Sequence, residues 1–167
     1  MCAMMTVAPM NEGVCAEMCG ICGVVQADSQ VTETLLRTMN DTIHHRGPDG
    51  EGYYVCDAVG LAMRRLAIID VGGSEQPLYN EDKSIVVVFN GEIYNYRALR
   101  QDLINKGHQF RTDGDGETIV HLYEEYGQDF PQYLRGQFAI GIDEIRRGRT
   151  IEVRDIPRTR PRGRFNP

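Results

Sequence analysis

Three cysteines near the start of the chain are the residues whose types and spacing most directly suggest chemistry. Cys15, Cys19 and Cys22 follow the spacing C-x3-C-x2-C. A thiolate is both a strong nucleophile and a soft metal ligand. Three interpretations therefore compete: inert cysteines, a covalent catalyst, or three ligands of a 4Fe–4S cluster, for which radical S-adenosylmethionine enzymes use this spacing.

The iron–sulfur interpretation has little support beyond the spacing of Cys15, Cys19 and Cys22. No strand pattern precedes Cys15, Ile21 rather than an aromatic residue precedes Cys22, and 167 residues are too few for the partial barrel of such enzymes. Short cysteine motifs also match frequently by chance. It stays an alternative, which a brown, iron-containing preparation would support.

Five ordered segments downstream carry a more specific pattern. They are MCGICG (18–23), IHHRGPDGEG (43–52), RRLAIID with QPLYN (64–70 and 76–80), FNGEIYN (89–95) and DGETI (115–119). Together they resemble the class II glutamine amidotransferases, the N-terminal-nucleophile hydrolases that open asparagine synthetases. HRGPDGEG, RRLAIID and QPLYNE are more similar to the asparagine synthetase branch than to the glucosamine-phosphate or purine branches.

The resemblance implies that Cys19 is the nucleophile and that its own α-amine is the base. An α-amine ordinarily has a pKa near ~8, which suits proton transfer at neutral pH. The thiolate would attack the side-chain amide of glutamine, release ammonia and leave a glutamyl thioester that water hydrolyses. The Asn90 side chain and the Gly91 N–H would stabilise the oxyanion. The Asn-Gly dipeptide alone would instead indicate a tight hairpin turn.

The same resemblance assigns the residues that would hold glutamine. Arg65 would bind the α-carboxylate, and Glu92 and Asp115 would bind the α-ammonium. Without the resemblance, Arg65 is a solvated strand residue, Glu92 a surface charge and Asp115 a helix N-cap. The full substrate-binding set is Arg65, Leu66, Ala67, Ile68, Ile69, Asn90, Gly91, Glu92 and Asp115.

The loop with His44, His45, Arg46 and Asp49 is interpreted as structural, lining the pocket. Adjacent histidines point apart in any regular structure, and no further ligand pair is spaced to join them. No metal ligand is therefore assigned.

Hydrophobic periodicity predicts the elements that must position these residues. Strands are expected over 20–26, on both sides of Gly60 within 53–71, over 84–89, 108–112 and, last, 137–142. Thr32, Asn95 and Asp115 are expected to cap three helices, and Gly107 and Gly127 to end the second and third. The residues expected on the inward faces are Leu35, Leu36, Met39 and Ile43; Leu99, Leu103 and Ile104; and Ile119, Leu122, Tyr123 and Tyr126.

Strands and helices in mixed order with short links indicate an α+β domain. The resemblance specifies an αββα sandwich of two mainly antiparallel sheets between helices, incomplete at the C-terminus. Residues 1–17 are expected to be a flexible leader or a mis-assigned start, 18–142 the amidotransferase domain, and 143–167 a disordered or aberrant end. That last stretch holds eight arginines against four acids, although the whole chain carries a net charge of −6.

Composition narrows the class of partners. With 41% hydrophobic and 25% charged residues, the chain suits one globular domain, and no apolar run is long enough to span a bilayer. Five cysteines without a secretory signal indicate reduced thiols and a cytoplasmic location. A net acidic chain disfavours nucleic acid.

The expected ligands follow from the resemblance. L-glutamine is the substrate, and the glutaminase half needs no cofactor. ATP and Mg would serve a synthetase half, which this sequence lacks and a partner domain or chain would supply. A homodimer is left open.

Two departures from the family pattern bear on activity. If translation starts at Met1, Cys19 has no free amine until Met18 and everything before it are removed. After Ile142 the family's tryptophan is absent, and Arg158 stands where a glycine is expected. The alternative function is therefore a catalytically inactive or interaction domain of the same fold, which an assay of glutaminase activity would separate.

Overall fold

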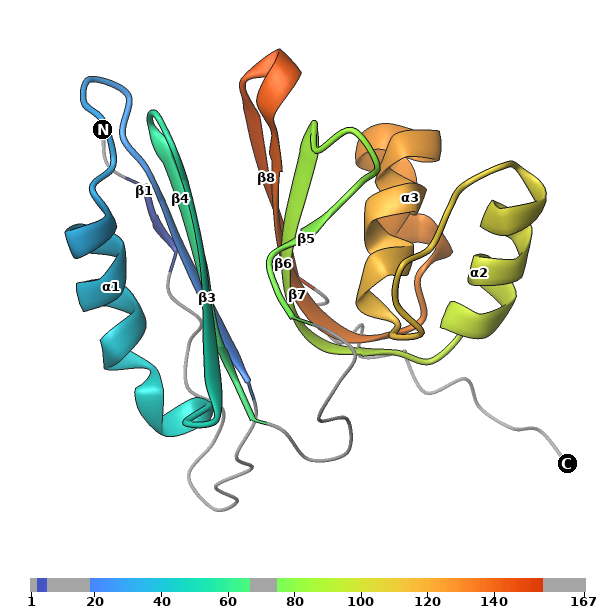
Figure 1. Ribbon diagram of the computed structural model, residues 1–167, viewed down its shortest axis with the longest axis horizontal. Helices are drawn as coiled ribbons and strands as arrows, with labels where there is room; N and C mark the ends of the chain where they lie inside the picture. Colours follow the sequence, from blue (N-terminus) through green and yellow to red (C-terminus); the bar gives the residue numbers. More distant parts are fainter. Residues whose placement is uncertain (1–2, 6–18, 67–74, 155–167) are drawn as a thin grey trace, which may run out of the picture.

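The structure, a computed structural model, describes residues 3–5, 19–66 and 75–154, which form two four-stranded antiparallel sheets (Figure 1). The first sheet has the order β1 (Ala3–Met5), β2 (Gly20–Val25), β4 (Val59–Arg65), β3 (Gly50–Cys56). The second has the order β5 (Leu78–Tyr79), β6 (Ile85–Ile93), β7 (Gly136–Glu144), β8 (Arg149–Arg154). Strands that neighbour in sequence mostly pair, as short links require.

Helices cover the outer face of each sheet. α1 (Glu33–Thr42) lies on the first sheet, and α2 (Tyr96–Asn105) and α3 (Gly116–Tyr126) lie on the second (Figure 1). Three 3₁₀ turns complete the described elements: η1 (His44–Arg46), η2 (Gly127–Tyr133) and η3 (Ile145–Arg147). The predicted αββα sandwich is confirmed. None of the helices in these ranges is long and apolar enough to cross a membrane.

The core has three layers, and the alternation of strand side chains decides which residue enters which layer. Between the sheets lie Ile21, Leu61, Met63, Val86 and Val88. Between the first sheet and α1 lie Cys22, Val24, Val31, Leu36, Met39 and Ala62. The third layer packs β6 and β7 against α2, α3 and η2. In β2 and β4, odd-numbered residues therefore face the other sheet and even-numbered ones face α1.

The predicted helix boundaries are largely confirmed, but two of the three caps work differently. The Thr32 hydroxyl accepts a hydrogen bond from Leu35 N at 3.2 Å, as an N-cap does. Asn95 and Asp115 occupy N-cap positions without capping their helices. Asn95 Oδ1 instead accepts from Arg135 N at 2.9 Å, and Asp115 Oδ2 from Ile93 N at 2.8 Å. In both cases the side-chain oxygen accepts from a backbone N–H of a distant segment instead of from the first turn of its helix.

Both glycines predicted to end helices follow them with positive φ, 104° at Gly107 and 53° at Gly127. The inward face of α1 is confirmed, with Leu36 and Met39 buried and Leu35 and Ile43 packed beside them. Ile104 is 43% exposed, so its predicted inward position is wrong. The α2 residues that pack in or against the core are Leu103, Leu99 and Tyr96.

Two strand predictions are also corrected. Residues 108–112 form no strand, because Arg111 N and Thr112 N donate to the Glu117 carboxylate at 2.8 and 2.7 Å rather than to a neighbouring strand. The strand over 137–142 is not the last one. β8 pairs with β7 from Ala139↔Arg154 to Glu144↔Arg149, and Ile151 and Val153 pack against the core.

The first 17 residues also contain a strand that periodicity did not predict. β1 has three residues, too few to show a period of two, and it pairs with β2 from Ala3↔Val25 to Met5↔Gly23. The rest of the proposed leader and residues 155–167 lie outside the described ranges. For them the expectations of a flexible start and a disordered end stay predictions.

Candidate active site

The residues singled out by the sequence gather at one end of the sandwich. The start of β2, the end of β4 and the end of β6 all lie at the lower side of the view in Figure 1. Cys19 immediately precedes β2, whose Gly20 pairs with Arg64 near the end of β4. Sequence segments far apart in the chain therefore meet where the two sheets end.

The Cys19 side chain is held against the backbone at the end of β4. Its Sγ is 3.2 Å from Leu66 N, which donates to it, and 3.8 Å from Leu66 O. The Cys19 carbonyl accepts from Arg46 Nε at 3.3 Å. An N–H aimed at sulfur is a contact that a thiolate retains and strengthens. These contacts fix the sulfur of a half-buried cysteine.

The loop after α1 lies against this end of β4, in agreement with a structural role. That the loop lines a pocket stays a prediction. A Cβ on Gly47 would lie 2.6 Å from the Arg64 carbonyl carbon, so the backbones are in direct contact. Asp49 N donates to Arg65 O at 3.0 Å. Arg46, which sequence reasoning placed only in the pocket lining, is the residue that holds the Cys19 carbonyl. A local pattern contains no signal for that contact, because 27 residues separate the two.

Two adjacent arginines at the end of β4 lie on opposite faces of the sheet because strand side chains alternate. Arg64 points to the α1 side, is 6% exposed, and forms ion pairs with Asp41 and with Glu51, the latter at 2.7 Å. Arg65 lies two residues after Met63, on the face toward the second sheet. Leu66 is the next residue, and its N–H contacts the Cys19 sulfur. Ala67, Ile68 and Ile69 lie outside the described residues, so their assignment stays a prediction.

Asn90 and Gly91 lie inside β6, opposite Ala139 and Phe138, so the hairpin-turn alternative is wrong. Asn90 is 8% exposed and follows Val88 by two residues, which places it on the face toward the first sheet. Gly91 has φ +138°, and a Cβ there would lie 2.0 Å from Gln137 O. Only glycine fits this conformation and contact.

Gln76 is a positioning residue that sequence reasoning did not single out. Its Oε1 accepts from Phe89 N at 2.6 Å and its Nε2 donates to Phe89 O at 2.8 Å. The side chain thus continues the β5–β6 ladder to the residue before Asn90. The Gln76 carbonyl lies against Gly52 of the first sheet, where a Cβ would be 2.0 Å from it. Gln76 therefore links both sheets beside the site.

Two acids lie at the end of β6. Asp115 accepts from Ile93 N, which ties the start of α3 to the residue after Glu92. Burial raises the pKa of Asp115, and the nearby Glu92 charge raises it further, against the lowering effect of its backbone hydrogen bonds. Adjacent carboxylates at a partly buried corner favour a bound cation such as an ammonium group.

Cys22 belongs to the core rather than to the site. It packs among Val24, Leu36 and Met39 on the α1 side, and its Sγ lies 3.8 Å from Asn40 Oδ1. Burial raises the pKa of the Cys22 thiol to about 11, despite the opposing effect of Arg64. A thiol that resists ionisation is a poor metal ligand, which weakens the iron–sulfur alternative. Cys15 lies outside the described residues.

Comparison with known proteins matches residues 18–161 to a family model described as a glutamine amidotransferase domain. Asparagine synthetase (glutamine-hydrolyzing) 3 of Arabidopsis thaliana is 46% identical over 140 residues, which cover 83% of this chain and 24% of that protein. Asparagine synthetase (glutamine-hydrolyzing) 2 of Bacillus subtilis (strain 168) is 44% identical over 142 residues, covering 83% and 19%. The chain thus spans a quarter or less of the length of these relatives.

A solved structure described as the allosteric regulatory enzyme of purine biosynthesis matches 55% of this chain and 22% of its own, at 27% identity and a TM-score of 0.47.

Proposed function

The chain belongs to the glutamine amidotransferase domain family, and we propose that it hydrolyses L-glutamine to glutamate and ammonia through a thioester on Cys19. The observation that carries the proposal is the placement of Cys19. Its sulfur is held by Leu66 N at the end of the sandwich where Asn90, Gly91 and Asp115 also lie. A nucleophile and oxyanion donors are parts that amide hydrolysis requires, and acids that bind an ammonium would recognise the amino-acid end of glutamine.

In the proposed reaction, the Cys19 α-amine takes the thiol proton and the sulfur attacks the amide carbon of the substrate side chain. The oxyanion of the tetrahedral intermediate accepts hydrogen bonds from the Asn90 side-chain amide and the Gly91 N–H. The C–N bond then breaks, the α-ammonium returns the proton to the leaving nitrogen, and ammonia departs. Water adds to the remaining thioester by the same base and releases glutamate and the thiol.

Substrate selection is proposed to depend on the amino-acid end of glutamine. The Arg65 guanidinium would bind the α-carboxylate in a bidentate manner, and Glu92 and Asp115 would bind the α-ammonium. The side chain alternation that turns Arg64 toward α1 and Arg65 toward the second sheet supports this choice between the two arginines.

In this proposal the ammonia serves an ATP-dependent asparagine synthetase, as the similar proteins' names suggest. ATP and Mg would belong to that synthetase part and not to the residues described above. A cytoplasmic location remains part of the proposal.

The deciding experiment compares two N-termini of the same chain. One preparation begins at Cys19 after removal of Met18, and the other retains Met1 with an intact, acetylated leader. We expect glutamate production only from the first, since the free α-amine is the proposed base. Mass spectrometry verifies each N-terminus. Equal activity from the blocked chain would refute the amine mechanism.

A variant pair tests the nucleophile itself. Cys19→Ala, in the chain that begins at residue 19, should abolish glutamate production, whereas the matched control Cys56→Ala should retain it. Cys56 is also a half-buried cysteine without a disulfide. It is the last residue of β3, at the end opposite to Gly50, which pairs with Arg65 beside the site. A correctly folded chain with a free Cys19 amine and no activity would favour the inactive-domain alternative.

A further inference from the structure

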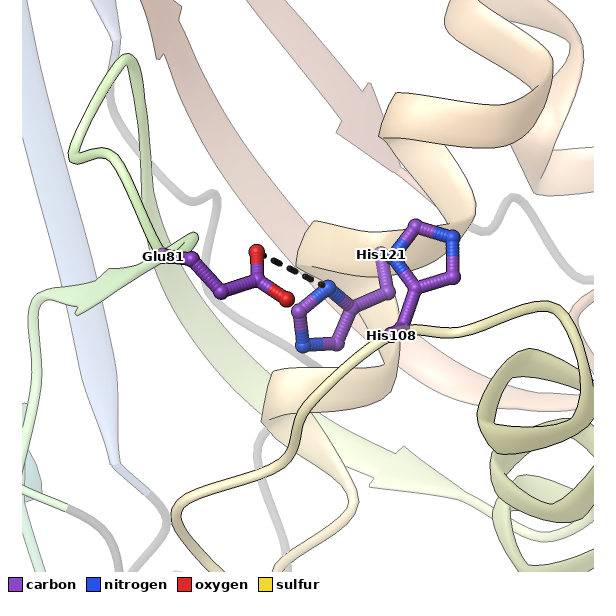
Figure 2. Close-up of side chains that lie close together, drawn as sticks. All are labelled: Glu81, His108 and His121. Carbon is purple, nitrogen blue, oxygen red and sulfur yellow. Dashed lines mark ion pairs between the residues drawn. The ribbon is translucent and has the colours of Figure 1, made fainter.

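A cluster of histidines and glutamates lies outside the proposed glutaminase site, beside α3. Glu81 comes from the loop between β5 and β6, His108 from the loop after α2, and His121 from α3 (Figure 2). One potential ligand atom of each lies within 4.8 Å of the others. Three separate segments thus bring two imidazoles and a carboxylate together, and none of these residues takes part in the proposed reaction.

A fourth side chain already lies between the two imidazoles. Glu124 Oε2 is 2.8 Å from His121 Nδ1 and 3.3 Å from His108 Nδ1, while Glu81 Oε2 is 3.9 Å from His121 Nδ1. Ligand atoms around a tetrahedral zinc lie about 3.3 Å apart, given bond lengths near ~2.0 Å. The distances from Glu124 Oε2 to the two Nδ1 atoms are therefore already close to those of a zinc site, and the Glu81 oxygen lies slightly farther from His121 Nδ1.

The other nitrogen of each histidine faces a carboxylate, which is the arrangement that metal-binding histidines use. His108 Nε2 lies 3.0 Å from Glu125 Oε1. His121 Nε2 is buried without a hydrogen-bond partner and lies 3.9 Å from Glu117 Oε1. A proton on each Nε2 would leave each Nδ1 lone pair free to bind a metal. It would also allow the buried His121 Nε2 to donate toward Glu117.

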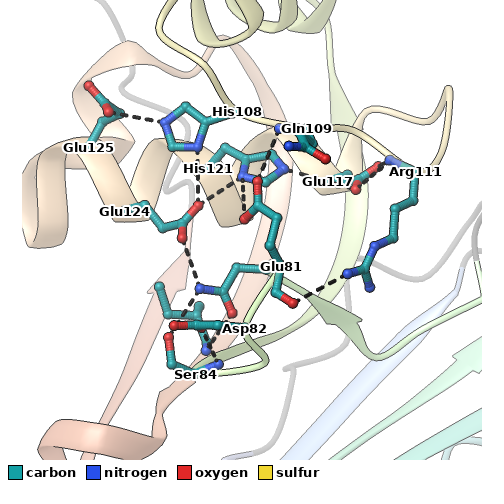
Figure 3. A network of polar contacts seen from close by, with 12 residues as sticks. Glu81, Asp82, Ser84, His108, Gln109, Arg111, Glu117, His121, Glu124 and Glu125 are labelled. Carbon is teal, nitrogen blue, oxygen red and sulfur yellow. Dashed lines mark hydrogen bonds and ion pairs between the residues drawn. The ribbon is translucent and has the colours of Figure 1, made fainter.

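The carboxylates are themselves held in place by other donors (Figure 3). Glu124 Oε1 accepts from Asn80 Nδ2 at 2.8 Å, and Glu81 Oε1 accepts from Gln109 N at 3.0 Å. Each acid is thereby anchored by one oxygen and presents the other to the cluster.

We propose that Glu81, His108, His121 and Glu124 bind a divalent transition metal ion, with zinc as the best fit. Two imidazole nitrogens and two carboxylate oxygens form a ligand set suited to zinc rather than to magnesium or calcium, which prefer all-oxygen sites. The ion would join α3, the β5–β6 loop and the loop after α2, so its effect would be on the stability of this side of the second sheet.

The test is a zinc titration of the purified, metal-stripped full chain in competition with a chromogenic chelator. We expect one ion per chain and a melting temperature that rises with zinc concentration. His108→Gln and Glu81→Gln should each weaken binding about tenfold or more, at least as much as loss of an outer partner does. His45→Gln, which removes an exposed histidine of η1, is the matched control and should bind like the wild type.

Two measurements keep the result interpretable. Melting curves without metal verify that the variants fold, which is why the fully buried His121 is not the residue replaced. Titration with Co²⁺ distinguishes the ligands, because thiolate ligation produces a charge-transfer band that imidazole and carboxylate ligation does not. Binding that is unchanged in both variants, or a cobalt complex with a thiolate band, would overturn the proposal.

Discussion

Replacing Gln76 by alanine tests how the loop before β5 supports the site. The Gln76 side chain pairs with both the N–H and the C=O of Phe89, at 2.6 and 2.8 Å, in the manner of a neighbouring strand. Phe89 is 5% exposed and directly precedes Asn90. Alanine would leave both backbone groups without their partner in a position that water reaches poorly.

The expected cost follows from those two groups. A buried donor or acceptor that loses its partner costs ~1–3 kcal/mol, so the pair together costs about 2–5 kcal/mol after some relaxation. That is a large part of the roughly 5–15 kcal/mol by which a domain is stable. Because Phe89 is bonded to Asn90, we also expect glutaminase activity to fall more than the folded fraction does.

The free energy of unfolding is measured by urea denaturation, and the m-value should be unchanged. Gln132→Ala is the control. Gln132 is exposed, and within the described residues its side chain donates only to Asp129, at 3.2 Å. Its replacement should therefore change the free energy of unfolding by less than ~0.5 kcal/mol. If Gln76→Ala were no more destabilising than Gln132→Ala, the Phe89 contacts would contribute nothing and the reasoning would be refuted.

Two further predictions concern buried polar groups. Because the pKa of Cys22 is about 11, only roughly a thousandth of it is thiolate at pH 8, so iodoacetamide should label it about 100-fold more slowly in the folded chain than in urea, and faster as pH rises; equal rates by peptide mass spectrometry would contradict this. Tyr54→Phe removes the 2.8 Å bond to Asp143, which keeps only its Thr150 contact among those described, and should cost ~1.5–3 kcal/mol in urea denaturation. Tyr94→Phe, at a 61% exposed position, is its control, and an equal loss there would count against an inter-sheet role for the Tyr54 hydroxyl.

Local patterns were sufficient for several features that depend on residues close in the chain. The cap of α1 by Thr32 spans three residues, and the glycines that end α2 and α3 lie within two residues of the last helical residue. The apolar run over 84–89 predicted a strand, and the structure forms one there, with Ile85 to Phe89 all buried. Such features are determined by residue propensity and hydrophobic periodicity, which depend only on the local sequence.

Tertiary structure decided which polar groups meet. Leu66 N donates to the Cys19 sulfur from 47 residues away, and the Asp115 carboxylate accepts from Ile93 N, 22 residues earlier, instead of capping α3. β8 forms because β7 offers it a free edge, although its own six residues are rich in charge. Hydrogen bonds of this kind depend on where two sheets end in space, and a sequence read in order contains no distance between segments that only folding brings together.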